Sequence, residues 1–201
     1  MQTTLESSII FSGVGLHSGR PVSLSIKPAS KNHGILFKRK DIEIGNPIVR
    51  ARWDYVSETT LCTRVRNEDG TAISTIEHLM AALAGCGVSN ALIELDSEEV
   101  PILDGSAAPF VKGILETGLK IVSSSSRIIK IIRPVMFENQ FGWARLSPYK
   151  RPEMEYFIEF DDLVIGKQSK ILNMSNGSFV KELCNSRTFC SNKDVETMRK
   201  N

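Results

Sequence analysis

The spacing of apolar residues changes near residue 74, from the alternation of a strand to the three- and four-residue steps of a helix. Before this point, Val22, Leu24 and Ile26 alternate with polar residues, as in a strand with one buried face. After it, the apolar residues follow helical spacing: Ile76, Leu79, Met80 and Leu83. Strands followed by a helix in one segment favour an α+β fold.

Further strands and a second helix are predicted around this change. The strand-like ranges are 5–10, 34–37, 48–52, 60–65 and 91–95. Gly85 and Gly87 are expected to stop the first helix. Ser106 should begin the second, with Pro109 tolerated in its first turn and Gly118 at its end. These elements predict a mostly antiparallel sheet with helices.

Four consecutive serines, residues 123–126, mark the best domain boundary, because such a run cannot build a core. The first domain is predicted over 1–122 and the second over 127–201. The second again places strands first, at 128–135, 143–146 and 153–160, and a helix later, at 178–185. Another helix, from about Asp194, still runs at Asn201. We therefore expect two two-layer α/β sandwich domains of similar topology, the second incomplete.

Charge and apolar content exclude several classes of protein. Lys and Arg number 25 against 23 Asp and Glu, and the one short basic stretch is 38–40, so nucleic acid is not an expected partner. No transmembrane segment is predicted, because no apolar run approaches the roughly 18 residues that span a bilayer. The four cysteines lack C-x-x-C spacing, and a reducing cytoplasm is the expected location. They are Cys62, Cys86, Cys184 and Cys190.

The pair Glu77-His78 has two interpretations. Ser74 and Glu77 fit the S-x-x-E capping box, in which both side chains bind backbone N–H groups at a helix start. Alternatively, a carboxylate beside an imidazole suits a metal hydrolase, with the imidazole as ligand and the carboxylate as base. His78 lies roughly 200° round the helix from Ile76, away from the apolar stripe. Spacing alone leaves both open.

A zinc site built from His17, His33 and His78 is a weaker alternative, because their spacing matches no ligand pattern. Two other stretches have structural explanations that spacing does not exclude. The stretch GVGLHSG (13–19) favours a tight connection around His17. In PILDGSAAPF (101–110), Asp104-Gly105 favours a turn and Ser106 a helix cap.

Five stretches, taken together and in order, carry a resemblance to a known family. They are GVGLHSG (13–19), TTLCT (59–63), STIEHLMAALAG (74–85), PILDGSAAPF (101–110) and SRTF (186–189). In these motifs the chain resembles the zinc-dependent UDP-3-O-acyl-N-acetylglucosamine deacetylases of lipid A synthesis. The resemblance covers nearly the whole chain and is far more specific than the Glu77-His78 pair alone. It implies two α+β sandwiches that face each other across a Zn²⁺ ion.

The resemblance also implies roles for individual residues. Glu77 matches the family's general base and His78 one of its three zinc ligands, while Thr188 matches a threonine that helps to hold the oxyanion. Phe160 and Phe189 match the substrate site, Phe189 as an aromatic that lines the sugar. Leu61 and Cys62 match the mouth of the acyl-chain passage, and His17 a supporting histidine.

The sequence departs from the family pattern at three places. Asp162-Leu163 stands where the family usually has His-Pro, which puts the loop near Phe160 in doubt. Cys190 replaces a glycine after the Thr-Phe pair, which would add bulk beside Thr188. The family's H-K-x-x-D helix, with the second and third zinc ligands, and its later general-acid histidine do not occur in these residues.

By the resemblance, the reaction is hydrolysis of the N-acetyl group of UDP-3-O-acyl-N-acetylglucosamine, with release of acetate. Such a zinc site needs three protein ligands and an open position, and only His78 is recognisable here. We therefore expect this chain alone to be inactive. The alternative is a non-catalytic relic or binding module that retains the first domain as a scaffold.

Overall fold

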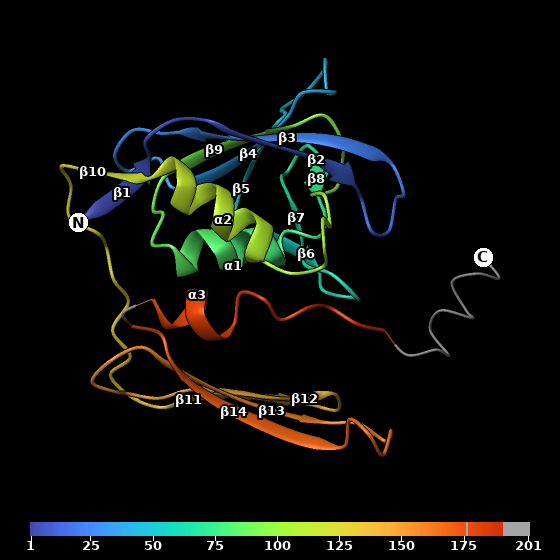
Figure 1. The fold of residues 1–201 in the computed structure, drawn as a ribbon, viewed down its shortest axis with the longest axis vertical. Helices are drawn as coiled ribbons and strands as arrows, with labels where there is room; N and C mark the ends of the chain where they lie inside the picture. The colour runs from blue at the N-terminus through green and yellow to red at the C-terminus, as the bar shows by residue number, and fades with distance from the viewer. Residues whose placement is uncertain (176, 191–201) are drawn as a thin grey trace.

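A five-stranded sheet forms the outer layer of the first half of the chain (Figure 1). The structure is a computed structural model that describes residues 1–175 and 177–190. The strand order is β2-β3-β9-β4-β5, and only the β4–β9 pair is parallel. The strands are β2 (Ile9–Val14), β3 (Pro21–Pro28), β9 (Ala91–Leu95), β4 (Ile35–Arg39) and β5 (Ile48–Arg50). The predicted mostly antiparallel sheet is thus confirmed.

Two helices pack on one face of this sheet, and the core lies between the sheet and the helices (Figure 1). They are α1 (Glu77–Gly85) and α2 (Ala108–Thr117). The predicted alternation holds, since Val22, Leu24 and Ile26 are all buried in the core with Leu79 and Phe110. Each buried side chain of this kind contributes about 1.5–3 kcal/mol, so the β3 face and the two helices stabilise each other.

Smaller sheets flank this core. β1 (Gln2–Leu5) pairs antiparallel with β10 (Leu119–Val122), which joins the two ends of the first half. A second small sheet has the order β6-β7-β8, with β6 (Val56–Glu58), β7 (Arg64–Arg66) and β8 (Ala72–Ile73). A short 3₁₀ helix, Trp53–Tyr55, precedes β6.

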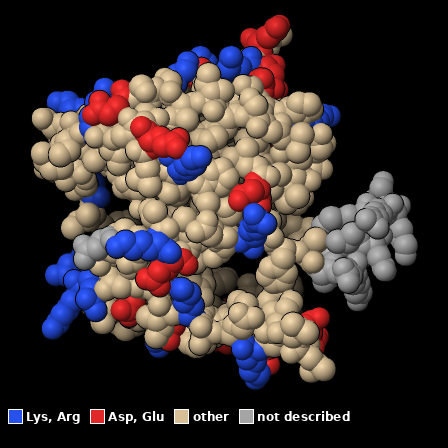
Figure 2. Space-filling view, in the orientation of Figure 1, with Lys and Arg blue, Asp and Glu red and all other residues tan. Residues whose placement is uncertain are grey.

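The second half consists of two hairpins and a short helix. The pairs are β11 (Val135–Asn139) with β12 (Gly142–Leu146), and β13 (Glu153–Glu159) with β14 (Lys167–Asn173). Helix α3 (Ser178–Glu182) lies between α1 and these strands (Figure 1). Phe179 of α3 and Cys184 after it are buried in the core of the first half. On the surface, positive and negative side chains are interspersed over the face that Figure 2 shows.

The α+β class is confirmed, but several element predictions are wrong. The strand at 5–10 is broken at 6–8, because β1 turns to β10 while β2 joins the main sheet. The strand at 60–65 shrinks to Arg64–Arg66, because Leu61 has a φ of 60°. The strand at 128–135 begins only at Val135, and Ile128, Ile129 and Ile132 are exposed.

The remaining predictions concern the helices and the boundary. The helix at 178–185 is shorter than predicted, and the helix from about Asp194 lies outside the described residues. The division at the serine run stays a prediction. In the described part of the chain, no helix is both long and apolar enough to cross a membrane.

Candidate functional site

A pocket of about 460 Å³ brings three of the site residues together, whereas Glu77 and His78 are not among the residues that line it. His17, Leu61 and Cys62 line it, with Ser74 and Glu99. Leu61 is 71% exposed, whereas Cys62 is half-buried. Leu61 lies in a loop, with a left-handed conformation, where a strand was predicted.

Glu77 is the first residue of α1 and binds the loop that carries Leu61 and Cys62. Its carboxylate Oε2 accepts the Thr63 N–H at 3.0 Å, and the Ile76 N–H donates to the Thr63 carbonyl at 3.3 Å. The predicted capping box is wrong, because Ile76 occupies the N-cap position and no side chain caps the helix. Thr75, with a φ of 58°, turns the chain before α1. The carboxylate of Glu77 therefore lies at the helix start, as the sequence predicted, but with a different partner.

His78 follows Glu77 on α1 and is half-buried, off the buried face of Leu79 and Leu83. No three His, Cys, Asp or Glu side chains in the described residues lie close enough to hold a metal ion. The three-histidine site of His17, His33 and His78 is therefore wrong. Taken alone, the described donors do not fit a zinc ion, which needs three protein ligands in a hydrolytic site.

Thr188 lies against the turn of the 101–110 motif. Its N–H donates to the Gly105 carbonyl at 2.9 Å. Next to it, Arg187 forms an ion pair with Asp104 at 3.6 Å. The Ser106 hydroxyl and N–H and the Arg187 guanidinium hold the pKa of Asp104 below its usual value. The turn thus fixes the segment that carries Thr188 on the first half of the chain.

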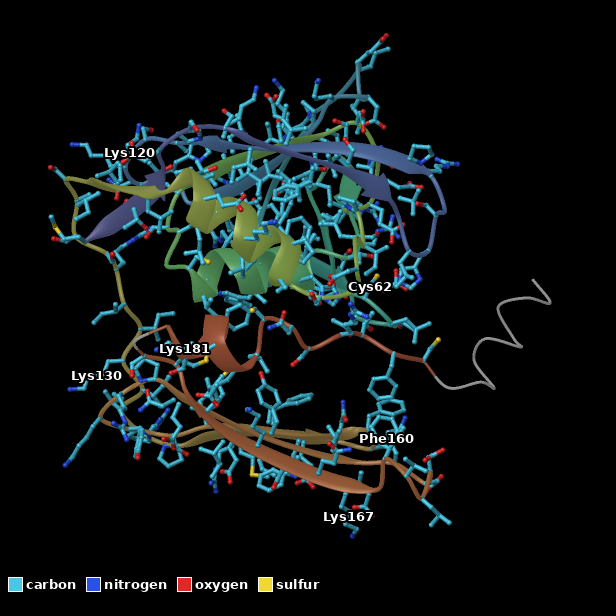
Figure 3. All side chains as sticks on the ribbon, in the orientation of Figure 1. Cys62, Lys120, Lys130, Phe160, Lys167 and Lys181 are labelled. Carbon is cyan, nitrogen blue, oxygen red and sulfur yellow. The ribbon has the colours of Figure 1, made fainter. Side chains whose placement is uncertain are left out.

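Phe160 and Phe189 form an aromatic pair, with ring centroids 5.5 Å apart. In Figure 3, Phe160 and Cys62 are both labelled on the right of the view, Cys62 beside the first half of the chain and Phe160 beside the hairpins of the second half. The loop after Phe160 is closed by Asp162, whose carboxylate accepts the Val164 N–H at 2.8 Å. This aspartate, which departs from the family pattern, therefore organises a turn of its own. Cys190 is exposed.

The sequence did not single out Glu99, which lines the pocket, or Thr75, which is hydrogen-bonded to Glu99. The carboxylate of Glu99 is buried and accepts the Thr75 hydroxyl at 2.8 Å. Their sequence signal is weak, since Glu99 stands in an acidic pair before an apolar run and Thr75 lies inside the supposed capping box. A carboxylate placed directly before V-P-I-L is the one hint of a buried acid.

Comparison with known proteins decides the family. The model of the UDP-3-O-acyl N-acetylglycosamine deacetylase family matches residues 2–201. The chain belongs to this family. Among curated deacetylases, "UDP-3-O-acyl-N-acetylglucosamine deacetylase" of Shewanella frigidimarina is 43% identical over 202 residues. Proteins of the same name from Shewanella halifaxensis and Idiomarina loihiensis are 42% and 41% identical over 204 residues.

The match to these deacetylases covers all of this chain and 66% of each relative. The resemblance drawn from the five motifs is thereby confirmed. The roles of the individual residues, the zinc ion and the cytoplasmic location stay predictions. The expected lack of a nucleic-acid partner also stays a prediction.

Proposed function

We propose that the protein containing this chain hydrolyses the N-acetyl group of UDP-3-O-acyl-N-acetylglucosamine and releases acetate, an early step of lipid A synthesis. The observation that carries the proposal is the family match over residues 2–201, which includes the stretch where Glu77 and His78 open α1. The pocket lined by His17, Leu61 and Cys62 supplies space for a substrate group.

Two residues of this chain take part in the proposed chemistry, one by accepting a proton and the other by stabilising a negative charge. In our proposal, Glu77 takes a proton from the attacking water, whose oxygen adds to the acetyl carbonyl carbon. Thr188 helps to stabilise the negative oxygen that forms. The C–N bond then breaks, the amine leaves with a proton from the general-acid histidine that the resemblance implies outside these residues, and Glu77 releases its proton to solvent. Zn²⁺ would supply Lewis-acid chemistry, with His78 as one ligand.

The direct test is acetate release by the protein expressed from its complete reading frame. We expect release from UDP-3-O-acyl-N-acetylglucosamine and none from the 201-residue chain alone. The competing function is a non-catalytic binding module, which the incomplete donor set of the described residues favours. Substrate binding by the complete protein without acetate release would establish that alternative.

The 201-residue chain should bind zinc only weakly, because one imidazole does not make a zinc site. Equilibrium dialysis with Zn²⁺ measures this directly. Tight binding of one ion per chain, lost in a variant with all three histidines replaced by alanine, would contradict it. The control is His33→Ala alone, which should leave the weak binding unchanged.

Leu61→Ala in the complete protein should raise KM for the long-chain substrate several-fold. Leu61 is exposed at the pocket, and each methylene that an acyl chain buries there contributes about 0.8 kcal/mol. The measurement compares KM for substrates with and without the acyl chain, since binding to a remote chain appears mainly in KM. Equal losses on both substrates would show that Leu61 supports the loop instead.

A further inference from the structure

Glu99 is a fully buried carboxylate that the proposed chemistry does not use. It is 1% exposed, and an ionised carboxylate in such a place is costly unless hydrogen bonds compensate it. Oε1 accepts the His17 N–H at 3.0 Å, and Oε2 accepts the Ser18 N–H at 2.8 Å. The Thr75 hydroxyl is a third donor, at 2.8 Å. Burial raises the pKa of Glu99, but these hydrogen bonds outweigh it and leave that pKa below the usual value.

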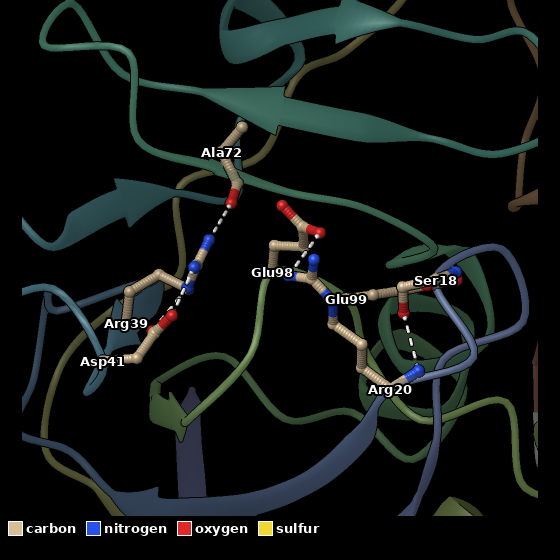
Figure 4. Close-up of polar contacts among 7 residues, drawn as sticks. All are labelled: Ser18, Arg20, Arg39, Asp41, Ala72, Glu98 and Glu99. Atoms are coloured by element: carbon tan, nitrogen blue, oxygen red, sulfur yellow. Dashed lines mark hydrogen bonds and ion pairs between the residues drawn. The ribbon is translucent and has the colours of Figure 1, made fainter.

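The first segment that Glu99 holds is the loop after β2, which carries His17 to the pocket. A Cβ at Gly15 would overlap the Glu99 carboxylate and the Ser18 hydroxyl. Only glycine therefore lets the loop close this tightly on the carboxylate. The Ser18 hydroxyl in turn accepts the Arg20 N–H at 3.3 Å, a contact that Figure 4 shows.

The second segment is the junction before α1. Thr75 has a φ of 58°, a left-handed conformation that is strained for a β-branched residue. The hydrogen bond from its hydroxyl to Glu99 helps to hold that conformation. Ser74 on one side of the junction pairs with Glu99 in a parallel β-bridge, and Glu77 follows two residues after Thr75. The direction in which α1 begins is therefore tied to the position of Glu99.

We propose that Glu99 is a positioning residue, which fixes the His17–Ser18 loop and the Thr75 junction so that Glu77 meets the substrate at one defined place. The claim that Glu99 holds the loop rests on the geometry alone, whereas the expected effect on turnover rests on the proposed function. Glu99 itself binds the His17 and Ser18 amides and the Thr75 hydroxyl, and it acts through this loop and Thr75.

The test compares Glu99→Gln with Asp96→Asn in the complete protein. Asp96 is a matched control, because it is an exposed carboxylate near Glu99 that also accepts a backbone N–H, that of Ser23 at 2.8 Å. The Gln side chain turns an NH₂ group toward one of the loop amides, which loses its acceptor. Hydrogen exchange of the His17 or Ser18 amide should rise roughly tenfold in Glu99→Gln and stay unchanged in Asp96→Asn.

Turnover is the second measurement. In Glu99→Gln, kcat should fall about tenfold or more while KM changes less than about threefold, because misplacement of Glu77 affects the reaction step. Asp96→Asn should keep both constants. Unchanged exchange at both amides, or faster exchange with unchanged kcat, would overturn the proposal. If the wild-type protein releases no acetate, the proposed function fails, and the exchange data still decide whether Glu99 holds the loop.

A second pair of variants covers the case in which Glu99→Gln does not fold. Thr75→Val keeps the shape of the side chain and loses its hydroxyl, whereas Thr75→Ser keeps the hydroxyl. We expect Thr75→Val to lower kcat with little change in KM, and Thr75→Ser to restore most of it. Equal turnover in the two variants would show that the Thr75–Glu99 hydrogen bond does not position Glu77.

Discussion

Replacing Glu77 with Gln in the complete protein should lower kcat by roughly 10²–10⁴-fold, the usual range for the loss of a general base. The substitution is a sharp test because it separates the two contributions that Glu77 can make. Gln cannot take a proton from water, but its amide oxygen can still accept the Thr63 N–H that Glu77 binds at 3.0 Å. The loop of Leu61 and Cys62 should therefore keep its place.

The controls for Glu77→Gln are substrate affinity and stability. Binding of the intact substrate and the melting temperature should both stay close to the wild-type values. Glu77→Ala should lose turnover to a similar extent and should also free the Thr63 amide, which hydrogen exchange detects. If Glu77→Gln turns over at the wild-type rate, Glu77 serves only to hold Thr63, and the proposed base must lie elsewhere.

Gly85→Ala should destabilise the protein by about 1–3 kcal/mol, the usual range for an overfilled core. Gly85 is the last residue of α1, and a Cβ there would overlap the ring of Phe179 on α3. Alanine normally favours a helix over glycine, so a loss of stability would identify the clash as the cause. Chemical denaturation followed by circular dichroism gives the change in the free energy of unfolding.

A double-mutant cycle makes this test specific. Phe179→Leu in the Gly85→Ala background should relieve part of the clash, so the double variant is more stable than the sum of the single effects. Ala84→Ser, at the exposed neighbouring position on α1, should change stability little. Additive effects of the two substitutions would mean that α3 does not pack against Gly85 as described.

Strands with one buried face were predictable, because a period of two leaves a clear pattern, as in Val22, Leu24 and Ile26. β14 was missed because Lys167–Asn173 is largely polar and exposed and shows no such alternation. The strand at 60–65 and the capping box failed for one reason. Leu61 and Thr75 both adopt positive φ, and neither residue type signals that conformation in a sequence.

For the site, the sequence placed Glu77 and His78 correctly at the start of a helix and off its buried face. It could not identify their surroundings, which depend on contacts between distant segments. Glu99 reaches His17 across 82 residues, and Thr188 reaches Gly105 across a similar gap. Such contacts follow from the tertiary fold and leave no local pattern in the sequence.

The pairing of β1 with β10 affects the order in which this protein can assemble as it is synthesised. Gln2 faces Val122, and the Gln2 N–H donates to the Ser124 carbonyl at 3.0 Å, so β1 pairs with a strand that is synthesised after all the other strands of the first half. Until residues 119–124 leave the ribosome, β1 has an unpaired edge. During translation, the first half can therefore complete its fold only after β10 and the beginning of the serine run have emerged.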